Sequence, residues 1–256
     1  MSSKVAIVTG ASQGIGRSTA IRLARDFDSI VLVARNRANL EETAAEVKKA
    51  GAEFLILDLD LSEHDAARQV VEQALARFGR IDALLNIAGA VPQIDVLEMT
   101  DEQWDRGLAL KLHGARRLTI AAWPALKESS GSVVLMSGNS ALFPKAPYAA
   151  VGTINAAIVA LAKAFSDRGI GDGVQVNSVL PGPVMTGRRR SYLEHWAPLH
   201  NMSVEEATAK FPVEAGIARY GTPEEIAELM AFVVSPAARW MTGSTLRMDG
   251  GEVKSI

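Results

Sequence analysis

A glycine-rich segment near the N-terminus has the residue types that bind phosphate. TGASQGIG at residues 9–16 places Gly10, Gly14 and Gly16 between the apolar run VAIVT and an amphipathic stretch. Glycines let a backbone approach a pyrophosphate closely, and the first N–H groups of the following helix supply donors and a favourable dipole. We therefore predict a nucleotide-binding loop here. An ordinary tight turn between a strand and a helix is the alternative.

A cationic side chain after the second apolar run bears on which nucleotide binds. IVLVARNR places Arg35 where folds that bind NAD usually present a carboxylate to the ribose 2′-hydroxyl. A guanidinium pairs with a 2′-phosphate, whereas a carboxylate would repel it. NADP is therefore favoured over NAD, with Arg37, Ser12 and Gln13 as further contacts. A solvated arginine at a strand end is the alternative.

The elements that must position these groups alternate along the chain. Short β-branched or apolar runs are separated by longer amphipathic stretches, which is typical of βαβ repetition. Helices are expected, among others, from Ser62 to Phe78, around 101–128 and around 149–167. We expect one α/β domain over residues 1–256, an open doubly wound parallel sheet of the Rossmann type with helices on both faces. Ligands then bind at the carboxyl ends of the strands. Residues 187–212 break the alternation and are predicted to form a mobile flap over that edge.

Composition excludes several classes of function. The chain has a net charge of −2, 48% hydrophobic residues, four His and no Cys. We therefore expect neither nucleic acid nor membrane as a partner, and no disulfide or metal site. The N-terminal apolar run is too short for a signal peptide, and the uncharged stretch 146–162 contains Pro147, Gly152 and Asn155, so a cytoplasmic protein is predicted.

Four motifs in order along the chain resemble the short-chain dehydrogenase/reductase family. They are TGASQGIG at 9–16, NIAG at 86–89, VNSVLPGPVMT at 176–186 and RMDGG at 247–251. The resemblance implies adenine contacts from Asp60 and Leu61, ribose contacts from the NIAG segment, and nicotinamide and pyrophosphate contacts from residues 181–186. The complete set of predicted cofactor residues is Gly10, Ser12, Gln13, Gly14, Ile15, Gly16, Arg35, Asn36, Asp60, Leu61, Asn86, Ala88, Gly89, Pro181, Gly182, Val184 and Thr186.

The family's usual catalytic residues, Asn, Ser, Tyr and Lys, are predicted to be substituted. WDRGLALKLHG at 104–114 aligns Lys111 with the Asn, and GSVVLMSGNSA at 131–141 aligns Gly138 with the Ser. NAAIVALAKAFS aligns Asn155 with the Lys, which leaves Val151 at the Tyr position. Moving the alignment by three residues would put Tyr148 at the Tyr position, but it would turn the apolar face of the following helix away from the sheet. Tyr148 is then either a packed loop aromatic or a nonstandard acid at the pocket rim.

The candidate catalytic residues are accordingly Lys111, Ser140, Tyr148 and Asn155. A buried Lys111 beside the cofactor would have a lowered pKa or serve as a fixed charge, whereas a solvent-exposed Lys111 would do neither. We predict hydride transfer between NADP(H) and a small-molecule carbonyl, alcohol or activated alkene. A noncatalytic NADP-binding protein is the main alternative, and nonredox chemistry is a third.

Two further segments suggest partners. GRRRSYLEHW at 187–196 carries three consecutive arginines that could receive a carboxylate or a phosphate-bearing carrier, or form a solvated face or a subunit contact. RYGTPEEIAELMAFVVSP at 219–236 predicts a helix with Thr222 as N-cap, Pro223 at the first position and two acidic residues in the first turn. It resembles the family's self-association surface, which implies a homotetramer or dimer.

Overall fold

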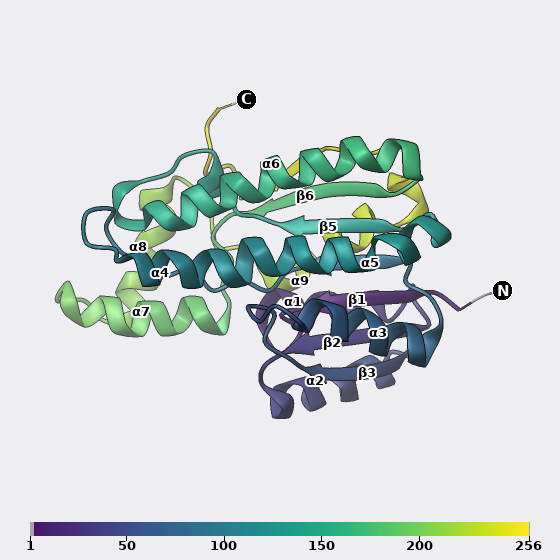
Figure 1. The fold of residues 1–256 in the computed structure, drawn as a ribbon. Helices are drawn as coiled ribbons and strands as arrows, with labels where there is room; N and C mark the ends of the chain where they lie inside the picture. The colour runs from purple at the N-terminus through teal and green to yellow at the C-terminus, as the bar shows by residue number, and fades with distance from the viewer. Residues whose placement is uncertain (1–2, 256) are drawn as a thin grey trace.

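The computed structural model describes residues 3–255 and contains one parallel sheet of seven strands in the order β3-β2-β1-β4-β5-β6-β7 (Figure 1). This is the predicted fold class. Apolar runs with little or no alternation form the inner strands, which is expected of a sheet covered on both faces. The strands are β1 (Val5–Thr9), β2 (Ser29–Ala34), β3 (Glu53–Asp58), β4 (Ala83–Asn86), β5 (Ser132–Met136), β6 (Gln175–Pro181) and β7 (Thr245–Met248).

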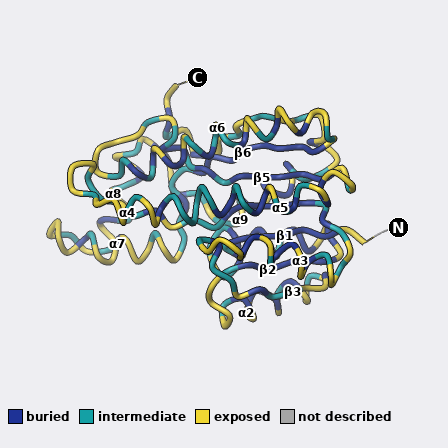
Figure 2. Tube along the Cα trace, in the orientation of Figure 1, coloured by how far each residue is buried: buried dark blue, intermediate teal, exposed yellow. Residues whose placement is uncertain are grey.

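Helices form a layer on each face of the sheet. One core lies beneath α3, α5 and α6 and includes Val70, Leu118 and Ile158, while the other lies beneath α1, α2 and α9 and includes Leu40 and Met230. Figure 2 shows the strands buried between these layers. The helices are α1 (Gly14–Leu23), α2 (Arg37–Lys49), α3 (Ala66–Phe78), α4 (Asp101–Gly107), α5 (Ala115–Ser129), α6 (Ala149–Asp172), α7 (Gly187–Leu199), α8 (Val204–Ala215) and α9 (Pro223–Val233).

The sheet changes direction of winding at β1, and this places the ligand edge. β1 pairs with β2 on one side and with β4 on the other, all in parallel. A crevice opens at the carboxyl ends of strands at such a switch point. Thr9 fastens the two central strands there, because its Oγ1 accepts hydrogen bonds from the backbone N–H of Ile87 (2.8 Å) and Ala88 (3.0 Å).

Several element boundaries differ from the sequence prediction. The helix expected from Ser62 begins at Ala66, because Ser62 forms a turn by donating to Asp60 through both its N–H and its hydroxyl. Residues 187–212, predicted to form a mobile flap, fall within α7, α8 and their connection. The helical stretch expected around 101–128 contains a π-helical segment, η1 (Leu108–Gly114), which periodicity did not predict.

Helix α6 extends beyond residue 167, where the sequence predicted its end. With the preceding turn it runs over Ala146–Asp172, long and apolar enough by length and composition to cross a membrane. Core helices of globular folds can be equally long and apolar. Ile154, Ile158 and Ala162 are buried on α6, which packs along β5 and β6. We therefore interpret it as a core helix of the α/β fold.

The predicted start of helix α9 is confirmed. Thr222 Oγ1 accepts a hydrogen bond from the N–H of Glu225 (3.2 Å), and the Glu225 carboxylate accepts one from the N–H of Thr222 (2.8 Å). This reciprocal capping box satisfies two backbone donors that the helix itself cannot. Pro223 occupies the first turn, as expected.

Replacing Thr222 with Ala is expected to lower the free energy of unfolding by about 1 kcal/mol, because one backbone donor at the start of α9 loses its acceptor. Urea denaturation followed by circular dichroism measures the change. Thr222→Ser keeps the hydroxyl and is the matched control. An equal loss of stability in both variants would show that the methyl packing of Thr222, and not the cap, matters.

Candidate functional site

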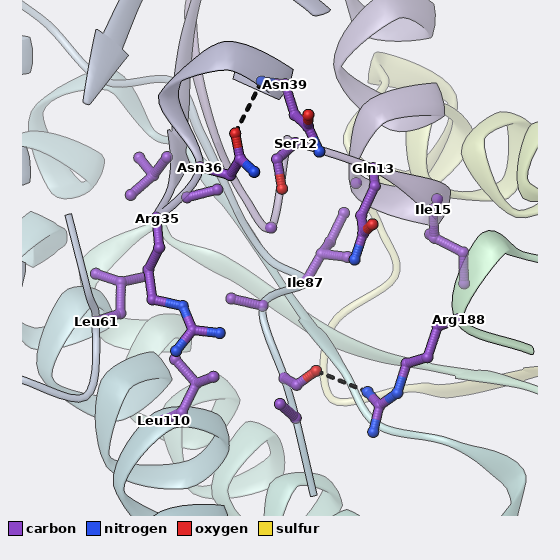
Figure 3. A pocket seen from close by; sticks show the side chains of 18 of the residues that line it. Ser12, Gln13, Ile15, Arg35, Asn36, Asn39, Leu61, Ile87, Leu110 and Arg188 are labelled. Carbon is purple, nitrogen blue, oxygen red and sulfur yellow. Dashed lines mark hydrogen bonds between the residues drawn. The ribbon is translucent and has the colours of Figure 1, made fainter. Parts of the chain in front are cut away.

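A cleft of about 860 Å³ opens at the carboxyl ends of β1, β2 and β4 (Figure 3). Its walls come from the glycine loop, the start of α2, the segments after β3 and β4, and the start of α7. Most of the predicted cofactor residues line it: Gly10, Ser12, Gln13, Gly14, Ile15, Gly16, Arg35, Asn36, Asp60, Leu61, Ala88, Gly89 and Thr186.

Four predicted cofactor residues do not line the cleft. Asn86 is buried, and its Nδ2 donates to Thr119 Oγ1 (3.1 Å), so it ties β4 to α5 beneath the site. Gly182 lies against Asp249, and Val184 forms a β-bridge with Gly221. Pro181 ends β6 as a buried residue. Residues 181–184 lead from β6 to Thr186 and the start of α7.

Steric limits explain the glycines of the loop. Gly10 and Gly14 adopt positive φ values of 68° and 53°, in the left-handed region that favours glycine. A Cβ on Gly16 would lie 2.1 Å from the carbonyl oxygen of Gly10. Only glycine permits this contact, which brings the N-terminus of α1 to the end of β1. The first residues of that helix then line the cleft, where a helix N-terminus favours phosphate.

One end of the cleft carries the cation expected to distinguish NADP from NAD. Arg37 donates hydrogen bonds to the carboxylates of Glu41 and Asp58, each with a nitrogen–oxygen distance of 3.1 Å. Arg35 is freer, because its nearest carboxylate oxygen, on Asp60, is 3.5 Å away and its side chain is 67% exposed. Figure 3 shows Arg35 beside Leu61 and Leu110, on the opposite side of the cleft from Arg188.

Asp60 is an ionised neighbour of this end. Burial of the Asp60 carboxyl opposes ionisation, but hydrogen bonds from Ser62 and the charge of Arg35 outweigh it and lower the pKa. Ser62 donates through its N–H (3.0 Å) and its hydroxyl (2.7 Å). The carboxylate is thereby fixed in place and only loosely neutralises Arg35.

Asn36 has a structural role that the sequence did not predict. Its side-chain oxygen accepts a hydrogen bond from the N–H of Asn39 (3.1 Å) and caps helix α2 (Figure 3). Asn36 also lines the cleft beside Arg35.

At the other end of the cleft, Lys111 of the π-helical segment η1 lies behind Gly89. Gly89 lines the cleft, whereas the candidate catalytic residues Lys111, Ser140, Tyr148 and Asn155 do not. The Nζ of Lys111 donates to the carbonyl oxygen of Ser137 (3.2 Å), and its alkyl chain crosses Gly89, where an added Cβ would lie 3.0 Å from Cδ. Burial, aided by the charge of Arg188, lowers the pKa of Lys111 to about 8. Such π-helical turns occur often at functional sites.

Asn155 and Gly138 form a second, buried contact. Asn155 is 3% exposed, and its Nδ2 donates to Ser140 Oγ (2.8 Å). A Cβ on Gly138 would lie 2.6 Å from that Nδ2, so the absence of a side chain at 138 makes room for the amide. The hydroxyl of Ser137 donates to the backbone carbonyl of Asn155 (2.7 Å). Asn155 Oδ1 is buried without a protein partner.

Val151 and Tyr148 lie near the start of α6 but do different things. Val151 packs against an apolar cluster containing Val91, Ala150 and Ile154. Tyr148 ends a short 3₁₀ turn before α6, as the sequence predicted for the residue ending the loop. Burial raises the pKa of the Tyr148 phenol, against the opposing charge and hydrogen bond of Lys145. The phenol is therefore protonated at neutral pH.

The structure also reveals cleft residues that the sequence did not single out. Arg188 lines the cleft. The sequence did not single it out, because three consecutive arginines give no sign of which one points inward. The cleft also has apolar lining from Ile87, Leu110 and Met136. Ile87 and Met136 lie at or near strand ends, which is the only sequence feature that could have predicted their place, and Leu110 lies in η1. Within residues 3–255, no group of three or more His, Asp or Glu side chains is arranged to hold a metal ion.

Known proteins of similar sequence and structure are reductases. A family model described as enoyl-(acyl carrier protein) reductase matches residues 10–252. Short-chain reductase protein NovJ of Streptomyces niveus is 31% identical over 247 residues, which cover 96% of this chain and 93% of that protein. L-sorbose reductase of Gluconobacter frateurii, solved with NADPH and L-sorbose, is 28% identical with a TM-score of 0.95, covering 100% of this chain and 98% of that one.

A variant of actinorhodin polyketide ketoreductase, solved with NADPH, is 30% identical with a TM-score of 0.92 and covers 98% of this chain and 97% of that one. The prediction of NADP as cofactor agrees with the NADPH in both solved structures. The glycine loop and the exposed Arg35 of this chain fit such a ligand. With matches that span nearly its whole length, the chain belongs to the short-chain dehydrogenase/reductase family.

Proposed function

We propose that this protein is an NADPH-dependent reductase of a small molecule in which Lys111 supplies the proton. One observation carries the proposal: Lys111, an ionisable side chain with a lowered pKa, packs against Gly89 directly behind the cleft wall. The usual Ser, Tyr, Lys and Asn are taken to be replaced by Gly138, Val151, Asn155 and Lys111.

The cofactor is held by groups along the whole cleft. The N-terminus of α1 and the backbone of residues 10–16 bind the diphosphate, and Arg35 pairs with the 2′-phosphate. Asp60 and Leu61 contact the adenine, while Ala88 and Gly89 contact the ribose. NADPH, when bound, supplies the hydride.

Lys111 and Ser140 handle the oxygen of the acceptor. Because the pKa of Lys111 is about 8, the side chain is mostly an ammonium at neutral pH, yet it releases its proton more readily than an ordinary lysine. It protonates the oxygen that becomes negative as hydride arrives, and solvent restores the proton. Ser140 accepts a hydrogen bond from Asn155, which leaves its own O–H free to donate to the same oxygen.

A noncatalytic NADPH-binding protein is the second candidate, and a specific observation favours it. Gly138 has no side chain and Val151 packs into an apolar cluster, so neither position exchanges a proton. Such a protein would bind NADPH and leave it unoxidised with every acceptor.

Tyr148 is a second candidate proton donor for the reductase. Its raised pKa keeps the phenol protonated at neutral pH.

Self-association and a cytoplasmic location remain predictions. Trp240 is 99% exposed, and Phe232 and Met248 are also exposed on the side of the molecule formed by α9 and the edge strand β7. These apolar side chains support a homodimer or homotetramer formed through that side.

The first test is calorimetric titration of the purified protein with NADPH and with NADH. NADPH is expected to bind at least about tenfold more tightly than NADH, and Arg35→Asp is expected to lower NADPH affinity by roughly ten- to a hundredfold, the worth of one charged hydrogen-bonded pair. NADH affinity should change far less. Arg17→Asp, outside the cleft, is the control. Equal binding of both cofactors by the wild type would contradict the role of Arg35.

The second test concerns Lys111 and pH. With an acceptor found by screening oxo acids, ketones and enones for NADPH oxidation, kcat/KM should be constant below the lysine pKa of about 8 and fall about tenfold per pH unit above it, because only the ammonium donates. Lys111→Met should lose roughly a hundredfold or more in kcat. Lys111→Arg retains the charge but cannot release a proton, so its turnover should also fall, and the residual activity should lack the alkaline limb.

Lys49→Met, on the surface of α2, serves as the control for Lys111. An unchanged turnover in Lys111→Met would remove Lys111 from the mechanism. Tight NADPH binding without oxidation by any acceptor would support the noncatalytic alternative.

A third test measures whether Gly138 and Asn155 depend on one another. Gly138→Ala is expected to cost about 1–3 kcal/mol of stability, because the new methyl displaces the buried amide of Asn155. The double variant with Asn155→Ala should lose at least about 1 kcal/mol less than the sum of the single losses, since the methyl then has room. Urea denaturation measures all four proteins of the cycle, and additive losses would contradict the coupling.

A further inference from the structure

We infer that Arg188 and Lys111 form a cationic subsite that binds an anionic group, a carboxylate or phosphate, of the substrate. This inference rests on the proposed function and names the class of substrate that the reductase takes. It also assigns a role to one arginine of the run at 188–190, which the sequence left among several.

Arg188 reaches from the first turn of α7 to the loop after β4. Its Nη1 donates to the carbonyl oxygen of Gly89 (3.0 Å) and its Nη2 to that of Val91 (3.1 Å). The first of these bonds is drawn in Figure 3, where the Arg188 side chain extends along the cleft. A guanidinium has five N–H donors, so three are left for a ligand.

Lys111 contacts the same loop, because its alkyl chain lies against Gly89. Its Nζ uses one of three donors, toward the carbonyl oxygen of Ser137. Arg188 and Lys111 therefore both meet at Gly89, one arriving from α7 and the other from η1. Their partners are neutral carbonyl oxygens, which satisfy hydrogen bonds but do not cancel charge.

Neither cation has a carboxylate partner among the described residues. Elsewhere in the cleft the arginines do: Arg35 faces Asp60, and Arg37 pairs with Asp58 and Glu41. Glu252, an acidic residue of the C-terminal segment, hydrogen-bonds instead with the Asn139 amide. Two unpaired positive charges in a partly desolvated site repel each other, and a bound anion relieves that cost.

The other two arginines of the run are directed elsewhere. Arg189 stacks on Phe211, with 4.0 Å from its guanidinium carbon to the ring centroid, and also lies over Tyr192 and Tyr220, so it holds α7 against α8. Arg190 is exposed to solvent. Arg188 alone of the three lines the cleft, and its place in the first turn of α7 adds the positive end of that helix dipole.

Acetoacetate and its uncharged methyl ester are suitable probes, because they differ in the carboxylate and share the ketone. Each is titrated by calorimetry into the protein with and without saturating NADP⁺. The wild type should bind acetoacetate at least about tenfold more tightly than the ester. Arg188→Met should lower the affinity for acetoacetate by about tenfold or more and leave the affinity for the ester unchanged. Arg188→Lys should restore part of the lost affinity.

Arg190→Met is the matched control and should bind both probes like the wild type. Equal binding of the two probes by the wild type, or no binding of acetoacetate, would overturn the inference. If Arg188→Met instead lost affinity for NADPH and kept that for acetoacetate, the anion would be the cofactor diphosphate, which also overturns it. Failure of the wild type to bind NADPH would sink the proposed function, whereas the titrations without cofactor would still decide the subsite.

Discussion

The cleft depends on the contact between Gly16 and the backbone of Gly10. Any side chain at residue 16 would overlap the Gly10 carbonyl, so helix α1 reaches the end of β1 only because that position is glycine. The helix N-terminus then points across the switch point of the sheet, where Thr9 joins β1 to the segment after β4. Arg35 from β2 and Gly89 after β4 take their places on the cleft wall from this geometry.

A similar relation between glycine and a longer side chain organises the other end of the cleft. Lys111 crosses Gly89, and Asn155 fills the space that Gly138 leaves. Asn155 and Ser137 are each engaged in buried hydrogen bonds, as polar groups in a folded core require. The residues at these positions therefore fit one another. Burial of the Lys111 ammonium, by contrast, costs stability, because the charged group loses hydration there.

The sequence predicted the parts of this structure that follow from local patterns. Apolar runs and glycine spacing were enough for the strands, the phosphate loop and the Thr222 cap, because each depends on neighbours in sequence. The π-helical segment around Lys111 was not predictable, since 3.6-residue periodicity carries no sign of one wider turn. Residues 181–184 were expected in the cleft by resemblance, yet packing against Asp249 and Gly221 turns them away from it. Orientation within the arginine run depends on tertiary contacts, of which sequence spacing gives no account.

Those tertiary contacts also connect helices α7 and α8 to the cofactor cleft. Arg189 joins α7 to α8 through Phe211 and Tyr220, so the two helices form one packed unit, and Arg188 fastens that unit to Gly89 and Val91. The same guanidinium is therefore both a tie between α7 and the loop after β4 and a charge beside Lys111, where it helps to lower the pKa of that lysine. The packing of α7 and the acidity of Lys111 thus depend on one side chain.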